Sequence, residues 1–189
     1  MTVHPIEAQS YRILTDRIDL SHLPSGQRAV VERVIHASAD LDYASAICFD
    51  PGAVEAALDA LRAGAPVVTD VEMVRAGIPG AICYLPADAV ANETTTRSAA
   101  GIRIAAQRHP SGAVVVVGCA PTALVEALEL PWEPAVIVGL PVGFVGASES
   151  KAQARASRHR TITNVGEKGG SAVAAAALNA LRRLANDAV

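Results

Sequence analysis

The chain has 189 residues, of which 51% are hydrophobic, 19% are charged and only 3% are aromatic. This length fits one domain over residues 1–189, and the scarcity of rings predicts a core of Ala, Val, Leu and Ile. The formal net charge of -3, with scattered basic residues, disfavours nucleic acid as a partner. The longest aliphatic stretch, residues 172–178, is too short to cross a bilayer, and residues 1–5 start no signal peptide, so we expect no membrane partner and a cytoplasmic protein.

The apolar pattern predicts alternating helices and strands along the chain. Ser25 is expected to cap a first helix over residues 26–39. The predicted strands are 44–49, 66–69, 81–85, 113–117 and 135–140, and the predicted helices between them are 52–63, 71–76, 96–107 and 122–128. A sixth extended run, 161–165, and a helix over 171–185 follow. This alternation predicts a three-layer α/β/α fold around a mainly parallel sheet of about five strands.

The segment 139–151 follows the fifth predicted strand and is rich in glycine. A segment of this kind at the carboxyl edge of an open sheet predicts a ligand site. We expect Ser148, Ser150 and Lys151 to supply donors for an anionic group, which points to an acid-bearing small molecule. Residues 166–171, just before the last helix, fit either a second anion loop or a tight turn capped by Ser171.

Several common enzyme signatures are absent from the sequence. There is no GxGxxG after a strand, no GxxxxGK[ST], no HExxH and no GxSxG, so the nicotinamide enzymes, P-loop NTPases, zincins and α/β-hydrolases lose support. Cys48, Cys83 and Cys119 are widely spaced and form no CxxC pair. They predict reduced thiols and no metal site.

His36 is the strongest candidate for a catalytic side chain. At helical spacing, Arg33, His36 and Asp40 share a polar face beside the buried stripe of the first helix. If that helix extends far enough, Asp40 is expected to hold one imidazole nitrogen and leave the other for proton transfer, with Arg33 beside it to bind a carboxylate. The spacing also fits an ordinary, partly exposed histidine.

Six motifs follow one another in a recognisable order along the chain. They are VIHASAD at 34–40, TDVEMV at 69–74, TRSAA at 96–100, APTAL at 120–124, the glycine-rich segment 141–151 and GGS at 169–171. In this order they resemble the precorrin-8X methylmutase family of cobalamin biosynthesis. The resemblance spans nearly the whole chain and implies a flavodoxin-like α/β domain, a homodimer and an isomerase that needs no cofactor. The implied reaction moves a methyl group between adjacent ring-C carbons of a corrin precursor, precorrin-8X or cobalt-precorrin-8, giving hydrogenobyrinic acid or its cobalt-containing counterpart.

The resemblance also implies which residues form the site. It places the catalytic histidine at His36, a substrate-contacting arginine at Arg33 and a substrate-contacting serine at Ser10. Further residues in the shared motifs are expected around the macrocycle: Thr96, Arg97, Ser98, Thr122 and Lys151. Family members commonly have Asn before the APTAL segment, where this chain has Cys119, a much weaker hydrogen-bonding group.

The expected chemistry suits these residues. A sigmatropic methyl shift needs no nucleophile, hydride donor or metal, and one acid such as His36 suffices to adjust charge on the conjugated ring. Arg33, Arg97, Lys151 and backbone N–H groups of the glycine-rich loops are expected to bind the carboxylate rim. Because a corrin precursor is broad and a single sheet offers only an open crevice, we expect a homodimer whose sites draw on both chains, with contributions from around Ser10 and from residues 92–97.

Two other functions stay open at this point. A non-catalytic tetrapyrrole carrier would bind the same macrocycle, but it would have no need of His36. A flavodoxin-like phosphate or nucleotide module would use the glycine-rich loops to bind an anion. The low aromatic content disfavours this second alternative, because few rings are available to stack on a flavin or a base.

Overall fold

The computed structural model describes residues 4–85 and 95–187, and its strands in these ranges form one sheet in the order β1-β6-β5-β4-β2-β3. The strands are β1 (Ile47–Phe49), β2 (Val67–Thr69), β3 (Ile82–Cys83), β4 (Val114–Val117), β5 (Val136–Gly139) and β6 (Thr161–Asn164). All neighbours pair in parallel except β1, which runs antiparallel to β6. The predicted α/β fold with a mainly parallel sheet is therefore confirmed.

The order of the parallel strands indicates where a ligand crevice lies in the sheet. Counted from β2, the five parallel strands lie in the order 2-1-3-4-5, which is the flavodoxin-like arrangement. The winding reverses between β2 and β4, and ligands of such sheets bind outside the carboxyl ends of the strands at this point. The loops that follow β2 and β4 are therefore the first place to search for a site.

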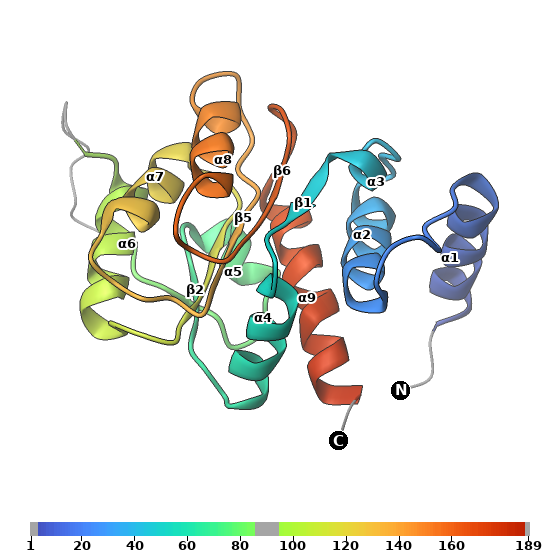
Figure 1. The fold of residues 1–189 in the computed structure, drawn as a ribbon, viewed down its shortest axis with the longest axis horizontal. Helices are drawn as coiled ribbons and strands as arrows, with labels where there is room; N and C mark the ends of the chain where they lie inside the picture. The colour runs from blue at the N-terminus through green and yellow to red at the C-terminus, as the bar shows by residue number, and fades with distance from the viewer. Residues whose placement is uncertain (1–3, 86–94, 188–189) are drawn as a thin grey trace.

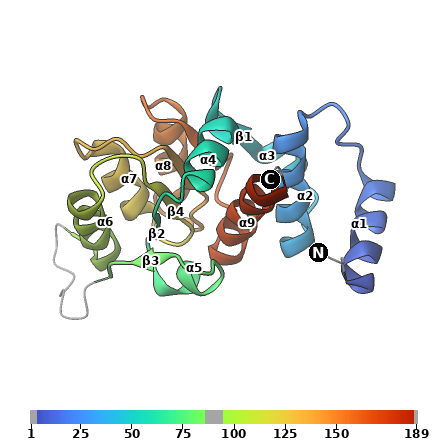
Figure 2. The same ribbon diagram turned by 90° about the horizontal axis from the view of Figure 1, so that it is seen from below.

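Helices cover both faces of the sheet (Figures 1 and 2). They are α1 (Pro5–Arg17), α2 (Ser25–Ser38), α3 (Tyr43–Ala46), α4 (Ala53–Arg62), α5 (Glu72–Ala76), α6 (Arg97–Arg108), α7 (Pro121–Glu129), α8 (Ala147–Arg155) and α9 (Ser171–Asp187). Side chains alternate along β4, so that Val114 and Val116 join the core under α4 and α9, whereas Val115 and Val117 join the core under α6, α7 and α8. This alternation produces the predicted three layers.

The alanine-rich helix α9 lies close to the sheet because its neighbours are glycines. A Cβ atom on Gly118 would lie 2.8 Å from the Cβ of Ala174, and one on Gly77 would lie 2.8 Å from the Cβ of Ala175. Helix α2 packs on α9, and α1 packs on α2 with Leu14 as its one buried residue. Helix α1 therefore forms the outermost element at one end of the molecule, and α6 lies near the other end (Figure 1).

Some element boundaries differ from the sequence prediction. The first predicted strand is correct only for residues 47–49, because Tyr43–Ala46 forms the short helix α3. Helix α1 was not predicted at all. The predicted cap at Ser25 is wrong, since α2 already begins at Ser25 after an extended Pro24 and has no side-chain cap bond. Among residues 4–85 and 95–187, no helix combines the length and the apolar character that a membrane crossing requires.

Candidate active site

His36 lies near the carboxyl end of α2 and contacts helix α1. Its Nδ1 atom lies 2.8 Å from the Ser10 Oγ atom, in a partly buried hydrogen bond. Among the described residues, no hydrogen bond engages the other ring nitrogen, Nε2. Ser10 thus takes the place that the sequence analysis gave to Asp40, and Nε2 is left as the ring nitrogen that could exchange a proton.

The expectation that Asp40 holds the imidazole is wrong. Helix α2 ends at Ser38, and Ala39 turns the chain with a left-handed φ of 54°. Asp40 is thereby carried away from the helix and pairs with the Lys168 ammonium at 2.6 Å, which also contacts Asp42 at 2.7 Å. The hydrogen bond from Lys168 lowers the pKa of the Asp40 carboxyl. The i+4 spacing could not foresee this, because few non-glycine residues adopt positive φ.

Arg33 forms a second contact between α1 and α2, one helical turn from the first. Its Nη1 atom donates to Glu7 Oε1 at 2.7 Å, and Arg183 from α9 donates to the same oxygen at 3.0 Å. The bond from Arg183 and the charges of both arginines hold the pKa of Glu7 below its usual range. Arg33 is therefore already paired with a carboxylate, and a substrate carboxylate would share or replace this contact.

The hollow beside His36 is small. Its volume is 110 Å³, and its lining includes Ser10, Ile13, Ile35 and His36. Ligand pockets for drug-sized molecules span about 300–1,000 Å³. One chain therefore presents His36 in a shallow depression that covers at most one edge of a large ligand.

Thr96 and Thr122 meet near the other end of the sheet. Their Oγ1 atoms lie 2.7 Å apart, and the Thr96 hydroxyl also accepts from the Ala99 backbone N–H as the cap of α6. Both threonines line a hollow of 500 Å³ that extends to Val145 of the glycine-rich loop. Arg97, which is exposed, and Ser98, which is half-buried, lie in the first turn of α6. The carboxyl edge thus has a second hollow, lined by Thr96, Thr122 and Val145, which we call the threonine end.

The segment 139–151 differs from its predicted form. The loop ends at Gly146, and residues 147–155 form helix α8, since they include good helix formers such as Ala, Glu, Lys and Arg. Ser150 is buried and donates to the Ala147 carbonyl. Lys151 is fully buried, with its Nζ atom donating to Asn164 Oδ1 at 3.1 Å and to the Lys168 carbonyl at 2.6 Å. Burial lowers the pKa of Lys151 to about 8.

These contacts give Lys151 a different position from the one expected for a substrate ligand. Its ammonium does not face solvent but donates to the backbone of the turn 165–168 from the protein interior. Asn164 supports the same turn by donating to the Lys168 carbonyl at 2.8 Å. This turn precedes the GGS motif, and it positions Lys168 to pair with Asp40. The buried Lys151 therefore supports the backbone at this edge of the sheet.

Asp70 spans the crevice between β2 and β4. Its carboxylate is 1% exposed and accepts the backbone N–H groups of Gly118 at 3.1 Å, Cys119 at 2.9 Å and Ala120 at 2.8 Å. Burial raises the pKa of this carboxyl although the three N–H groups oppose the shift. The loop before α7 is therefore held through its backbone, which does not depend on the side chain at position 119. Burial and the nearby charge of Asp70 raise the pKa of the Cys119 thiol.

Large apolar side chains are exposed along the same carboxyl edge. Met73 after β2 is 69% exposed, and Phe144 and Val145 after β5 are 91% and 88% exposed. Exposed apolar side chains that gather beside polar groups mark a ligand or an interaction surface. This edge can therefore cover an apolar ring face while neighbouring hydroxyl and N–H groups bind polar substituents.

The sequence-predicted residues do not form one cluster within a chain. His36, Ser10 and Arg33 lie on α1 and α2, whereas Thr96, Arg97, Ser98 and Thr122 lie at the starts of α6 and α7 near the opposite end of the molecule (Figure 1). The structure thus brings Ser10 to His36 and Thr96 to Thr122, but it does not bring the first pair to the second. Residues 92–94, which were also expected at the site, lie outside the described residues.

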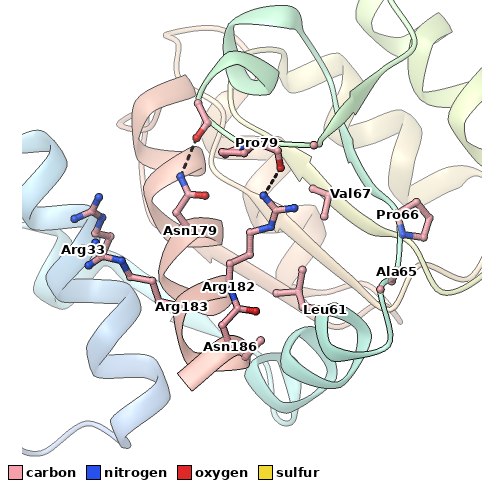
Figure 3. Close-up of a pocket in the computed structure, with 14 residues that line it drawn as sticks. Arg33, Leu61, Ala65, Pro66, Val67, Pro79, Asn179, Arg182, Arg183 and Asn186 are labelled. Carbon is pink, nitrogen blue, oxygen red and sulfur yellow. Dashed lines mark hydrogen bonds between the residues drawn. The ribbon is translucent and has the colours of Figure 1, made fainter. Parts of the chain in front are cut away.

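A hollow of 860 Å³ lies at the opposite, amino edge of the sheet (Figure 3). There Asn179 donates to the Gly77 carbonyl at 2.8 Å, and Arg182 donates to the Pro79 carbonyl. The carboxyl ends of α4, α5 and α9 border this hollow, and their dipoles oppose an anionic ligand. The arginines here are already engaged, because Arg182 donates to the Pro79 carbonyl and both Arg33 and Arg183 pair with Glu7. We therefore do not place the site in this hollow.

Sequence reasoning missed the groups that hold the site residues in place. Glu7 and Tyr11 were not singled out, although Glu7 lies one helical turn before Ser10. Asp70 was named only as part of the TDVEMV motif. Its place directly after a buried strand could have identified it as a residue of the carboxyl edge. Within the described ranges, no group of three or more His, Cys, Asp or Glu side chains could hold a metal ion.

The chain is similar to a solved structure over almost its full length. The chain superposes on a precorrin-8X methylmutase from Thermus thermophilus with a TM-score of 0.88 and 36% identity, covering 97% of this chain and 96% of that one. This defines an α/β domain of the methylmutase type. Residues 5–184 match the family described as precorrin-8X methylmutase, CbiC. The chain belongs to the precorrin-8X methylmutase family, as its six motifs suggested.

Curated relatives named for the cobalt-containing substrate and relatives named for precorrin-8X both match over almost their full length. A cobalt-precorrin-8 methylmutase from Methanothermobacter thermautotrophicus is 40% identical over 97% of this chain and 94% of its own. A precorrin-8X methylmutase from Pseudomonas aeruginosa is 41% identical over 93% of each chain. The sequence identity to the two kinds of relative is nearly the same, 40% and 41%. Both a cobalt-containing and a metal-free substrate therefore stay as candidates.

Proposed function

We propose that this chain catalyses the methyl shift on ring C of precorrin-8X or cobalt-precorrin-8, as an isomerase of cobalamin biosynthesis. The observation that carries the proposal is the match to the methylmutase family over residues 5–184. The products would be hydrogenobyrinic acid or cobyrinic acid. The family match together with the single sheet also supports one domain over residues 1–189, and a cytoplasmic location stays a prediction from the sequence.

His36 would act as the acid and base of this reaction. Ser10 engages Nδ1, which fixes the ring and leaves Nε2 to lend a proton to the conjugated system and to take it back after the methyl has moved. The methyl group leaves one ring carbon and bonds to its neighbour within the same molecule, so atoms and charge balance. The protein needs only to hold the macrocycle and to exchange this one proton.

The rim of the macrocycle would be bound by the remaining predicted residues. Arg33 and Arg97 suit its carboxylates, and the hydroxyl groups of Thr96, Ser98 and Thr122 suit its polar substituents. The exposed Phe144 and Val145 would pack on the apolar ring face. Lys151 is left out of this set, because its buried ammonium is engaged with Asn164 and Lys168.

A homodimer would complete the site. The 110 Å³ hollow at His36 is too small for a corrin ring, and the threonine end lies near the opposite end of the molecule. A twofold partner that sets its threonine end against His36 would create two equivalent sites, each drawing on both chains. The outward-facing Ile6, 71% exposed, lies on the helix that such a partner would approach.

The decisive experiment follows the visible spectrum of the purified protein with metal-free precorrin-8X and, separately, with cobalt-precorrin-8. Conversion of one substrate with many turnovers per chain is the expected result. A spectral shift that stops at one equivalent would identify a tetrapyrrole carrier instead. No spectral change with either compound would contradict binding of this substrate class.

A further inference from the structure

Tyr11 lies against the ring of His36. The two ring centroids are 5.0 Å apart and the planes differ by 10°, so the rings are stacked. Tyr11 follows Ser10 in the chain and is half-buried between α1 and α2. Arg33 also donates to the Tyr11 hydroxyl at 3.5 Å, a long contact. The imidazole thus meets two consecutive residues of α1, one at its Nδ1 edge and one across its face.

These two contacts restrict different motions of the imidazole. The hydrogen bond to Ser10 fixes the position of Nδ1, but the ring can still tilt about that contact because the terminal torsion of histidine has a broad minimum. A parallel ring on one face removes this tilt. Ser10 and Tyr11 together therefore determine the direction in which Nε2 points.

Helix α1 itself is weakly anchored, which makes the stacking contact important. Its one buried residue is Leu14, and Ile6 and Ile13 are 71% and 46% exposed. The ion pairs of Glu7 with Arg33 and Arg183 add a polar attachment at its first turn. Since a helix this exposed gains little from burial, side-chain contacts such as that of Tyr11 decide where Ser10 stands relative to His36.

We propose that Tyr11 is a positioning residue, whose ring holds the plane of the His36 imidazole so that Nε2 points at the substrate. This inference rests on the proposed function, because it concerns the histidine that exchanges the proton. It assigns the effect to the ring of Tyr11 and not to its hydroxyl. Phenylalanine at this position should therefore act nearly as well, whereas an aliphatic side chain should not.

The test compares Tyr11→Phe with Tyr11→Leu in steady-state turnover of the precursor that the wild type converts. We expect Tyr11→Phe to keep kcat within about 3-fold, and Tyr11→Leu to lower kcat by about 10-fold to 100-fold with KM changed by less than about 2-fold. Tyr84→Phe is a matched control, since Tyr84 bonds to His109 at 2.8 Å and neither residue lines the hollow at His36 or the one at Thr96. This control should leave both constants unchanged.

A second measurement needs no turnover. In wild type and in Tyr11→Phe, the ring protons of His36 should show the upfield NMR shift that a stacked aromatic ring causes, and Tyr11→Leu should lose it. If the wild type converts neither precursor, the proposed function fails while this signature still tests the stacking. Equal kcat in wild type and Tyr11→Leu would overturn the inference. An equal loss in Tyr11→Phe and Tyr11→Leu, or a rise in KM alone, would overturn it as well, because these results assign the effect to the hydroxyl or to substrate contact.

Discussion

Ser10, Arg33 and His36 on α1 and α2 form what we call the histidine end of the molecule. This end and the carboxyl edge of the sheet are built in different ways. At the histidine end, side chains on two surface helices hold one another, as in the pairs Ser10 with His36 and Glu7 with Arg33. At the sheet edge, the buried groups Asp70 and Lys151 hold backbone atoms of the loops. The first region can be changed without disturbing the core, whereas the second is part of it.

This difference predicts that the two regions affect different properties, one catalytic activity and the other stability. Substitutions at the histidine end should change activity with little effect on stability, because the side chains there are half-buried and replaceable. Substitutions of Asp70 or Lys151 should change stability first, because they leave buried partners unsatisfied or remove a buried charge. Each prediction below tests one side of this contrast.

The largest expected effect is that of His36→Ala. Loss of the acid and base should lower kcat by about 10²-fold to 10⁴-fold. The free energy of unfolding should change by less than about 1 kcal/mol, because His36 lies on the partly exposed face of α2. Turnover and urea unfolding measure the two quantities, and His22→Ala, an exposed histidine on a loop, is the control. Wild-type turnover in His36→Ala would remove this residue from the reaction.

The next effect concerns the carboxylate that spans the crevice. Asp70→Ala leaves three backbone N–H groups without their acceptor, so the free energy of unfolding should fall by about 3 kcal/mol or more. Asp59→Ala is the matched control, because Asp59 is 80% exposed and pairs with Arg62 on the surface. It should stay within about 0.5 kcal/mol of the wild type. Similar small losses in both variants would show that Asp70 does not hold the loop.

The smallest effect is a pH dependence from Lys151. The folded state lowers its pKa to about 8, whereas the unfolded value is about 10.4. Between these values the unfolded chain binds a proton that the folded chain does not, so wild-type stability should rise with pH relative to Lys151→Met. Urea unfolding at several pH values across this window measures the difference. Lys168→Met should show no such gain, because the hydrogen bonds to Asp40 and Asp42 raise the pKa of Lys168. A flat difference for Lys151→Met would mean that its ammonium is not desolvated.

Much of the fold and part of the site could be predicted from the sequence. The valine-rich strands gave the sheet, and helical spacing correctly placed Arg33 and His36 on one helix, since both features are local. The partner of His36 could not be predicted in this way, because Ser10 lies 26 residues away on a helix of low amphipathicity. Lys151 was misplaced for a similar reason: its burial depends on Asn164, a residue of a different element.

We propose that each site joins the histidine end of one chain to the threonine end of another, and mixing two variants tests this proposal most directly. His36→Ala and Arg97→Glu should each be inactive alone. A 1:1 mixture, unfolded and refolded together, should recover about a quarter of wild-type activity, because half of the random dimers are hybrids and each hybrid holds one intact site. Activity in the mixture no higher than the mean of the two parent variants would contradict the shared site.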